Sequence, residues 1–180
     1  MAVKEILVWP NPILNQKSER IEHFDSELRS LVRDLIETMV HRGEAAGLAA
    51  TQIGVLKRVF IADIPPEHND GDGTNGPEAF INPEFIERQG SFEWQEGCLS
   101  VLDEYGECMR GPVMRSDKIV MRYQDLDGKV HTRKTHGYLS GCFQHEADHL
   151  DGILWVDHQS RLRRNMLKKK ALKYHANHQR

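Results

Sequence analysis

His145 and His149 stand four residues apart, with Glu146 directly after the first, and this is the pattern in the chain that could do chemistry. On an α-helix, positions i and i+4 lie on one face, one turn apart, so both imidazoles can hold one metal ion. Glu146 would then lie beside the ion, where its carboxylate can take a proton from a water molecule. The pattern therefore predicts a metal site and metal-assisted hydrolysis.

The alternative interpretation is a pair of surface histidines without a metal. The surrounding segment argues against it, because it is rich in apolar side chains: Tyr138, Leu139, Cys142, Phe143 and Leu150. An apolar helix is expected to be buried, and buried histidines need partners. Gly152 follows the segment and fits the end of such a helix.

A third ligand is needed, since a catalytic site of this type usually has three protein ligands and one open position. Three histidines lie further along the chain. His158 is a candidate, although no motif surrounds it. His175 and His178 lie in a basic tail and are weaker candidates.

The three cysteines are better candidates for the third ligand. Cys142 precedes His149 by seven residues, a rise of about 10 Å along a helix, so we expect it to pack beside the site. Cys98 follows Gly97, whose backbone freedom suits a ligand presented from a strand or loop. The residues alone favour Cys98 over Cys108 and leave both open.

Three segments of the chain, in this order, resemble the motifs of the peptide deformylase family. They are Ala45-Ala46-Gly47-Leu48-Ala49-Ala50-Thr51-Gln52, Glu96-Gly97-Cys98-Leu99-Ser100 and Gln144-His145-Glu146-Ala147-Asp148-His149-Leu150. The resemblance extends from about residue 6 to the C-terminal helix. It implies a metal-dependent hydrolase that removes the N-formyl group from the formyl-methionine of nascent polypeptides and releases formate.

The resemblance also assigns roles within the metal site. Cys98, His145 and His149 would bind the metal ion, and Glu146 would be the general base and acid. The family implies Fe²⁺ in the cell. Zn²⁺ and Ni²⁺ are the alternatives, and two histidines with one cysteine also suit Zn²⁺ by ligand type.

Three further residues receive roles in substrate binding from the same resemblance. Gln52 and the backbone N–H of Leu99 would stabilise the negative charge that develops on the formyl oxygen, and Gly47 would contact the substrate backbone. The substrate would be an N-formyl-methionyl peptide.

The chain departs from the family pattern in several places. Ala45 replaces a glycine, Leu102 replaces a proline, and the stretch Asp103–Pro112 is longer than usual. Ala46 and Gly141 are smaller than the aliphatic residues common at these positions. If both line the pocket, they predict extra volume around the first side chain and a broader substrate preference.

Composition limits the other functions. The chain has 180 residues and a formal net charge of −3, so we expect one catalytic domain over residues 1–180 and no DNA partner. No apolar run approaches 18 residues, and no signal-peptide pattern is present, so no membrane partner is expected. Three cysteines, an odd number, favour a reducing compartment and therefore the cytoplasm.

The sequence predicts one helix near the N-terminus and another near the C-terminus. Asp25 is expected to cap a helix from Ser26 to about His41, which Gly43 ends. The segment Gln159–Tyr174 is strongly basic and predicts a helix with a solvated face. The resemblance suggests a ribosome contact through this helix.

The middle of the chain reads as strands: 58–64, 79–82, 85–88, 91–94, 119–123 and 129–135. A mobile loop is expected over residues 65–78, which are rich in proline, glycine, aspartate and asparagine. Asp127-Gly128 is a strong hairpin signal. The predicted fold class is α+β, with short antiparallel strands packed around a central metal-binding helix and with N- and C-terminal helices.

Two alternative functions remain at this level. One is a metalloprotease-like hydrolase, and the other is a catalytically altered deformylase homologue with a different N-acyl substrate. A binding protein with a structural metal is disfavoured, because such a site needs four closed ligands and no base like Glu146.

Overall fold

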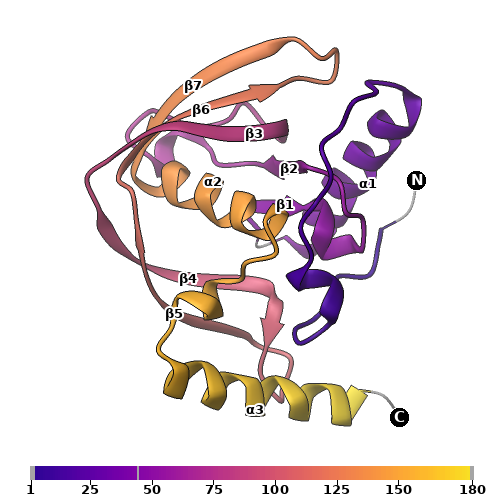
Figure 1. Ribbon diagram of the computed structural model, residues 1–180, viewed down its shortest axis with the longest axis vertical. Helices are drawn as coiled ribbons and strands as arrows, with labels where there is room; N and C mark the ends of the chain where they lie inside the picture. Colours follow the sequence, from indigo (N-terminus) through magenta and orange to yellow (C-terminus); the bar gives the residue numbers. More distant parts are fainter. Residues whose placement is uncertain (1–2, 44, 179–180) are drawn as a thin grey trace.

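The computed structural model describes residues 3–43 and 45–178, which form two antiparallel sheets and three α-helices (Figure 1). The larger sheet has the order β1-β2-β3-β6-β7, with these strands at Gly47–Ala49, Val59–Ala62, Glu78–Gln89, Lys118–Gln124 and Val130–His136. The smaller sheet pairs β4 (Phe92–Leu102) with β5 (Cys108–Arg115). This arrangement confirms the predicted α+β fold class.

Helix α1 spans Ser26–Arg42, one residue longer than predicted. The carboxylate of Asp25 accepts hydrogen bonds from the backbone N–H groups of Glu27 and Leu28, so it caps the helix. Gly43 ends the helix in the left-handed region, with a φ of 73°. The start, the end and the capping residue of this helix are therefore confirmed.

Strand β2 is buried on both of its faces, which explains why its sequence is an unbroken apolar run. Val59 and Ile61 pack in the cluster that contains the apolar side of α1. Phe60 and Ala62 point the other way, into the cluster that contains α2 (Gly137–Leu150). The two helices thus cover opposite faces of the larger sheet.

Three phenylalanines fix α2 on the sheet. The ring centroid of Phe80 lies 5.1 Å from that of Phe60 and 4.5 Å from that of Phe143, which belongs to α2. All three side chains are fully buried. Because they come from two strands and a helix, they set the distance between α2 and the sheet.

Strand β3 corrects a prediction. The sequence predicted two strands, Ala79–Asn82 and Phe85–Arg88, but one strand runs through both and through Pro83. The register with β6 shifts between Ile81 and Glu84, so Pro83 lies in a β-bulge. A proline at a bulge bends a strand without ending it.

The hairpin of β6 and β7 confirms the turn signal at residues 127–128. The carboxylate of Asp125 accepts hydrogen bonds from the backbone N–H groups of Asp127 and Lys129. Gly128 has a φ of 78°, which the turn requires. The register pairs residue 124 with residue 130 and residue 118 with residue 136.

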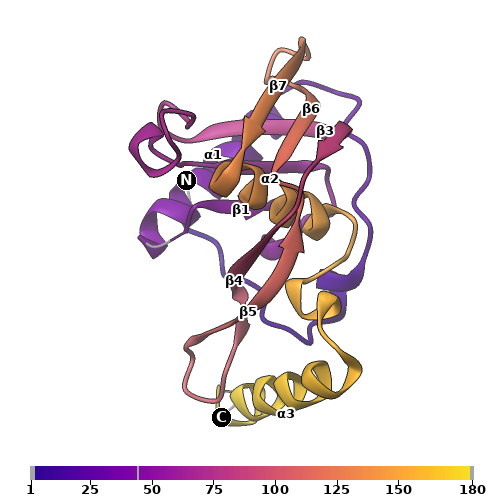
Figure 2. The same ribbon diagram turned by 90° about the vertical axis from the view of Figure 1, so that its left-hand side faces the viewer.

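The smaller sheet and α3 (Arg161–His178) form the lower end of the molecule (Figures 1 and 2). The predicted strand 91–94 is the first part of the longer β4, and the extended stretch after Leu102 forms the tip of the hairpin and most of β5. Ala171 of α3 is buried in a cluster with Met109 and Trp155. The basic helix is therefore also part of the core.

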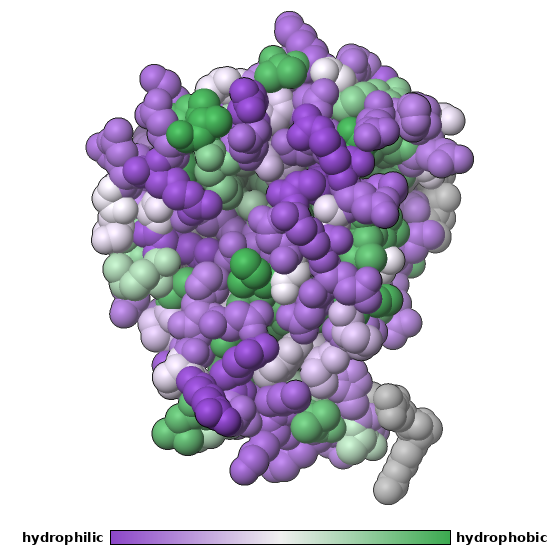
Figure 3. Space-filling model, viewed as in Figure 1, coloured by the Kyte–Doolittle hydropathy of each residue, from purple (hydrophilic) through white to green (hydrophobic). Residues whose placement is uncertain are grey.

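The described part of the chain also has four single-turn 3₁₀ helices, at Pro12–Asn15, Ala50–Ile53, Pro66–His68 and Trp155–His158. Among the described helices, none combines the length and the apolar character needed to cross a bilayer. Figure 3 shows one face of the molecule, which is mostly hydrophilic with small, separate apolar groups.

Candidate metal centre and its pocket

Helix α2 brings together the three residues that the sequence placed on one helix. His145, Glu146 and His149 are all buried, and the two imidazole centroids lie 4.9 Å apart. The helix lies between the larger sheet and β4, so it has almost no polar outer face. Most of the helix is buried, which explains why apolar residues such as Leu139, Phe143 and Leu150 surround the motif.

Cys98 reaches the same place from β4. Side chains on a strand alternate between faces, and Trp94, Glu96 and Cys98 all contact residues of α2. The Sγ atom of Cys98 is 3.2 Å from Nε2 of His149. One ligand atom from each of Cys98, His145 and His149 lies within 4.8 Å of the others. In the part of the chain that the structure describes, these three residues form a cluster able to hold a metal ion.

The cluster fits a catalytic metal by its chemistry. One thiolate and two imidazoles are a ligand set for a transition metal, and three protein ligands leave one position open. Oε2 of Glu146 is buried and makes no hydrogen bond with any described residue. This oxygen is thus available to a water molecule beside the ion.

A buried carboxylate orients His145. Oε2 of Glu96 lies 2.7 Å from Nδ1 of His145, so Nε2 is the ring nitrogen left for a metal. Arg115 of β5 donates to both carboxylate oxygens of Glu96. Burial raises the pKa of Glu96, but the hydrogen bonds from His145 and Arg115 outweigh it and hold this pKa below its usual value.

Arg115 also ties the far end of α2 to the smaller sheet. Its Nη1 is 2.6 Å from Oδ2 of Asp148, and Nε2 of His158 is 2.8 Å from the same oxygen. His158, a candidate third ligand from the sequence, therefore pairs with Asp148 and is not in the ligand cluster.

Cys108, Cys142 and His175 also lie outside the cluster. Cys108 and Cys142 line the adjoining pocket. Burial raises the pKa of the Cys142 thiol well above its usual value, which suits the predicted packing role. His175 lies 3.2 Å from the carbonyl oxygen of Trp9, and the side chain of His178 is outside the described residues.

Gly47 lies against Glu146. A Cβ atom at Gly47 would be 2.7 Å from Oε1 of Glu146, so any larger residue would displace the carboxylate. Burial raises the pKa of Glu146 to about 7. A carboxyl group with such a pKa can both accept and release a proton near neutral pH.

Gln52 points its amide group into the site. Its Oε1 accepts a hydrogen bond from the backbone N–H of Ala49, which fixes the direction of the amide. Its Nε2 then faces Sγ of Cys98 at 3.5 Å and Oγ of Ser100 at 3.1 Å. Leu99 follows Cys98 on β4 and lines the same pocket.

The pocket beside the cluster is a cavity of about 150 Å³. Cys98, His145 and Glu146 are among its polar lining residues, and Ala46, Trp94, Tyr138 and Cys142 are among its apolar ones. The ring of Trp94 meets the ring of Tyr138 edge to face, with centroids 5.2 Å apart. The pocket thus has an aromatic wall.

This wall corrects the expectation of extra volume at Gly141. A Cβ atom at Gly141 would lie 2.7 Å from the ring of Trp94. The indole therefore occupies the space that a larger residue at position 141 would take. The missing aliphatic side chain is replaced by an aromatic one from β4, and no room is gained there.

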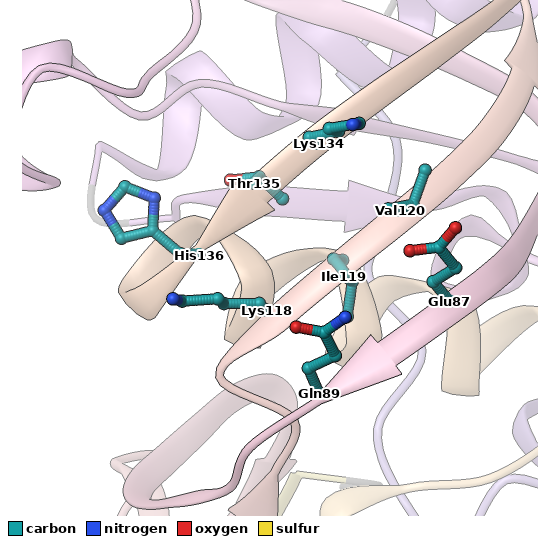
Figure 4. Close-up of a pocket in the computed structure, with 8 residues that line it drawn as sticks. All are labelled: Glu87, Gln89, Lys118, Ile119, Val120, Lys134, Thr135 and His136. Atoms are coloured by element: carbon teal, nitrogen blue, oxygen red, sulfur yellow. The ribbon is translucent and has the colours of Figure 1, made fainter.

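A second hollow lies on the outer face of the larger sheet, over β3, β6 and β7 (Figure 4). Its volume is about 320 Å³, and exposed side chains such as Glu87, Lys118 and Lys134 surround it. Alternation along the strands turns these residues away from α2. This hollow is separate from the metal-binding candidates.

No role for Glu96, Arg115 or Trp94 follows from the sequence patterns alone. Glu96 stood inside a recognised motif, which was the available signal. The roles of Arg115 and Trp94 depend on contacts with residues 33 and 47 positions away, Asp148 and Gly141, which no local pattern shows.

Comparison with known proteins agrees with this geometry. The family model described as polypeptide deformylase matches residues 3–165. A peptide deformylase of Novosphingobium aromaticivorans is 43% identical over 189 residues, covering 96% of this chain and 97% of the relative. One of Zymomonas mobilis is 44% identical over 174 residues, covering 96% and 95%.

Solved structures are similar as well. The peptide deformylase of Legionella pneumophila has a TM-score of 0.85 at 35% identity, and the match covers 99% of both chains. That of Ehrlichia chaffeensis in complex with actinonin has a TM-score of 0.86 at 34% identity, covering 96% of this chain and 98% of that one. The matching model, the relatives and the fold agree over nearly the whole length, and the chain belongs to the polypeptide deformylase family.

Proposed function

We propose that Cys98, His145 and His149 hold the catalytic metal ion of this deformylase. The chain is a metal-dependent hydrolase that removes the N-formyl group from nascent polypeptides and releases formate. The observation that carries the assignment is the meeting of one thiol and two imidazoles, within 4.8 Å, beside a buried carboxylate. A divalent ion bound there lowers the pKa of water and polarises a carbonyl group.

Glu146 moves the proton in this proposal. It follows His145 directly, so it lies beside the ligand cluster without belonging to it. Its raised pKa lets it take a proton from the attacking water and deliver it to the nitrogen of the leaving amine. Gly47 leaves the carboxylate room to stay in this position.

Gln52 and the backbone N–H of Leu99 stabilise the oxyanion in this proposal. The amide of Gln52 is held by Ala49, so its N–H group is already directed toward the site before substrate arrives. A donor fixed in advance costs little reorganisation during the reaction, and one such donor is typically worth about 3 kcal/mol.

The substrate backbone lies along β1, in our proposal. This strand pairs with β2 on one side and is the edge of the larger sheet. An edge strand offers N–H and C=O groups to an added strand. Gly47 is on this strand beside Glu146, so a peptide paired there has its N-terminal end near the ligand cluster.

The first side chain of the substrate occupies the apolar side of the pocket. Trp94 and Tyr138 form an aromatic wall there, and Ala46 and Cys142 complete the lining. A methionine side chain suits such a wall, because its sulfur makes favourable contacts with aromatic rings.

The metal in the cell is Fe²⁺ in our proposal, as the family resemblance implies. The same ligand set also accommodates Zn²⁺ or Ni²⁺. We further propose that residues 1–180 act as one catalytic domain in the cytoplasm, where nascent polypeptides and reduced thiols occur together. Cell fractionation with antibody detection tests the location.

A ribosome contact through α3 is a further part of the proposal. Lys168, Lys169 and Lys170 are exposed and consecutive, whereas Ala171 and Leu167 face the core. The cations are thus displayed outward from a helix whose other side is fixed. Ribosomal RNA is the polyanion that such a surface would meet.

The ligand assignment predicts which residues control metal binding. Cys98→Ala, His145→Ala and His149→Ala should each lose the metal, because two ligands hold an ion far more weakly than three. Cys142→Ala and His158→Ala are matched controls and should keep it. Metal analysis of anaerobically purified protein measures this, and it also tests Fe²⁺. Full metal content in Cys98→Ala would contradict the assignment.

Glu146→Gln should keep the metal and lose activity. The amide has nearly the shape of the carboxylate but cannot accept the proton, so turnover of formyl-Met-Ala-Ser should fall about 10²-fold or more. Bound metal and kcat are measured on the same sample. Near-normal kcat would remove Glu146 from the mechanism.

The aromatic wall predicts a preference for sulfur. Formyl-methionine and formyl-norleucine peptides have nearly the same shape, so a sulfur–aromatic contact should favour methionine by about two- to tenfold in kcat/KM. Trp94→Leu should bring this ratio close to one, and Tyr105→Leu, an exposed aromatic elsewhere, should leave it unchanged. An unchanged ratio in Trp94→Leu would contradict the contact.

The ribosome contact predicts a charge-dependent effect. Changing Lys168, Lys169 and Lys170 to Glu should weaken cosedimentation with ribosomes at low salt, while peptide turnover stays normal. The control variant has the same change in net charge at another place: it replaces three exposed lysines of the β6–β7 region (118, 129 and 134) with Glu. Equal loss in both triple variants would mean that only net charge matters.

A further inference from the structure

The first turn of α2 is capped by a residue that lies 69 positions earlier in the chain. Oδ1 of Asn69 accepts a hydrogen bond from the backbone N–H of Tyr138 at 2.9 Å and a longer one from that of Leu139 at 3.4 Å. Nδ2 of Asn69 donates to the carbonyl oxygen of His136 at 3.1 Å. One amide side chain thus bonds three backbone groups at the start of the helix.

The helix has no capping group of its own at this end. His136 occupies the N-cap position but makes no side-chain capping bond, and the first turn holds no acidic residue. The first N–H groups of any helix lack partners within it. Asn69 is only 6% exposed, so water cannot easily reach the N–H groups beside it. The amide oxygen of Asn69 accepts their hydrogen bonds instead.

Gly137 shows how close the two segments are. Its φ is +56°, and a Cβ atom there would lie 2.9 Å from Oδ1 of Asn69. A side chain at this position would push Asn69 away from the helix. The glycine and the asparagine therefore form a matched pair.

The loop that carries Asn69 is held in place by other contacts. Thr74 Oγ1 accepts a hydrogen bond from the backbone N–H of Ile64 at 2.7 Å. Arg133 of β7 donates to Asp72 and to the carbonyl oxygen of Gly73. These contacts anchor the segment predicted as a mobile loop, so Asn69 is presented from a fixed position.

The capped turn is the one that forms the pocket wall. Tyr138, whose N–H group bonds Asn69, packs edge to face on Trp94, and both line the pocket. His145 follows Tyr138 by seven residues, which is about two turns. The aromatic contacts of Phe143 and the Asp148–Arg115 pair hold the helix near the ligands.

We infer that Asn69 is a positioning residue for the substrate pocket of this enzyme. It fixes the first turn of α2, and through Tyr138 it fixes the aromatic wall that receives the first side chain. This inference rests on the proposed function of the pocket. Loss of the cap should therefore weaken substrate binding and leave the metal ligands in place.

The test compares Asn69→Ala, Asn69→Asp and His68→Ala. Asn69→Ala should raise KM for formyl-Met-Ala-Ser about three- to tenfold, in line with the loss of a helix cap, with kcat within about twofold and metal content unchanged. Asn69→Asp keeps the acceptor oxygen and should restore most of the affinity. His68→Ala changes the neighbouring, exposed residue of the same loop and should behave as the parent.

Amide hydrogen exchange supplies a measurement that does not depend on activity. Exchange of the Tyr138 and Leu139 amides should be faster in Asn69→Ala than in the parent and close to the parent in Asn69→Asp. Circular dichroism checks that each variant is folded. If Asn69→Ala does not fold, Asn69→Ser takes its place. The serine side chain is too short to bond all three backbone groups that Asn69 bonds.

The outcomes separate this inference from the proposed function. A parent without deformylase activity would defeat the proposed function, while amide exchange would still report on the cap. An active parent in which Asn69→Ala and His68→Ala change KM equally would defeat the inference, because any change in the loop would then suffice. A fall in kcat or in bound metal at unchanged KM would defeat it as well.

Discussion

Glu96 brings a negative charge into a part of the protein that excludes water, and such a charge needs an opposite charge and hydrogen bonds. Arg115 of the neighbouring strand supplies the opposite charge, and His145 of α2 lies at hydrogen-bond distance. Both strands of the smaller sheet and the metal helix must therefore meet at one point. Cys98 lies two residues further on the same strand face, so the same constraint brings its thiol to the two histidines.

The elements around α2 approach so closely that large residues on one side require small ones on the other. Gly47 leaves space for the carboxylate of Glu146, and Gly141 leaves space for the indole of Trp94. Interiors are close-packed, so volume missing in one side chain is taken by a neighbour. A small residue in an active-site helix is therefore not by itself evidence of a larger pocket.

Helix α2 is held along its whole length by residues from other elements. Asn69 bonds its first turn, the phenylalanine cluster contacts its middle, and Arg115 pairs with Asp148 near its end. These contacts come from a loop, the larger sheet and the smaller sheet. A helix fixed in this way can keep the candidate metal ligands, Glu146 and the aromatic wall in one geometry.

Local patterns in the sequence determined the helix carrying His145 and His149, the cap at Asp25, the hairpin at Asp127-Gly128 and the family. Each is a signal that spans a few residues, which is why sequence could reveal it. Tertiary structure decided that β3 continues through Pro83, that Trp94 fills the space beside Gly141, and that Asn69 caps α2. These outcomes depend on segments that meet only after folding, and packing and hydrogen bonding between such segments leave no periodicity in the chain.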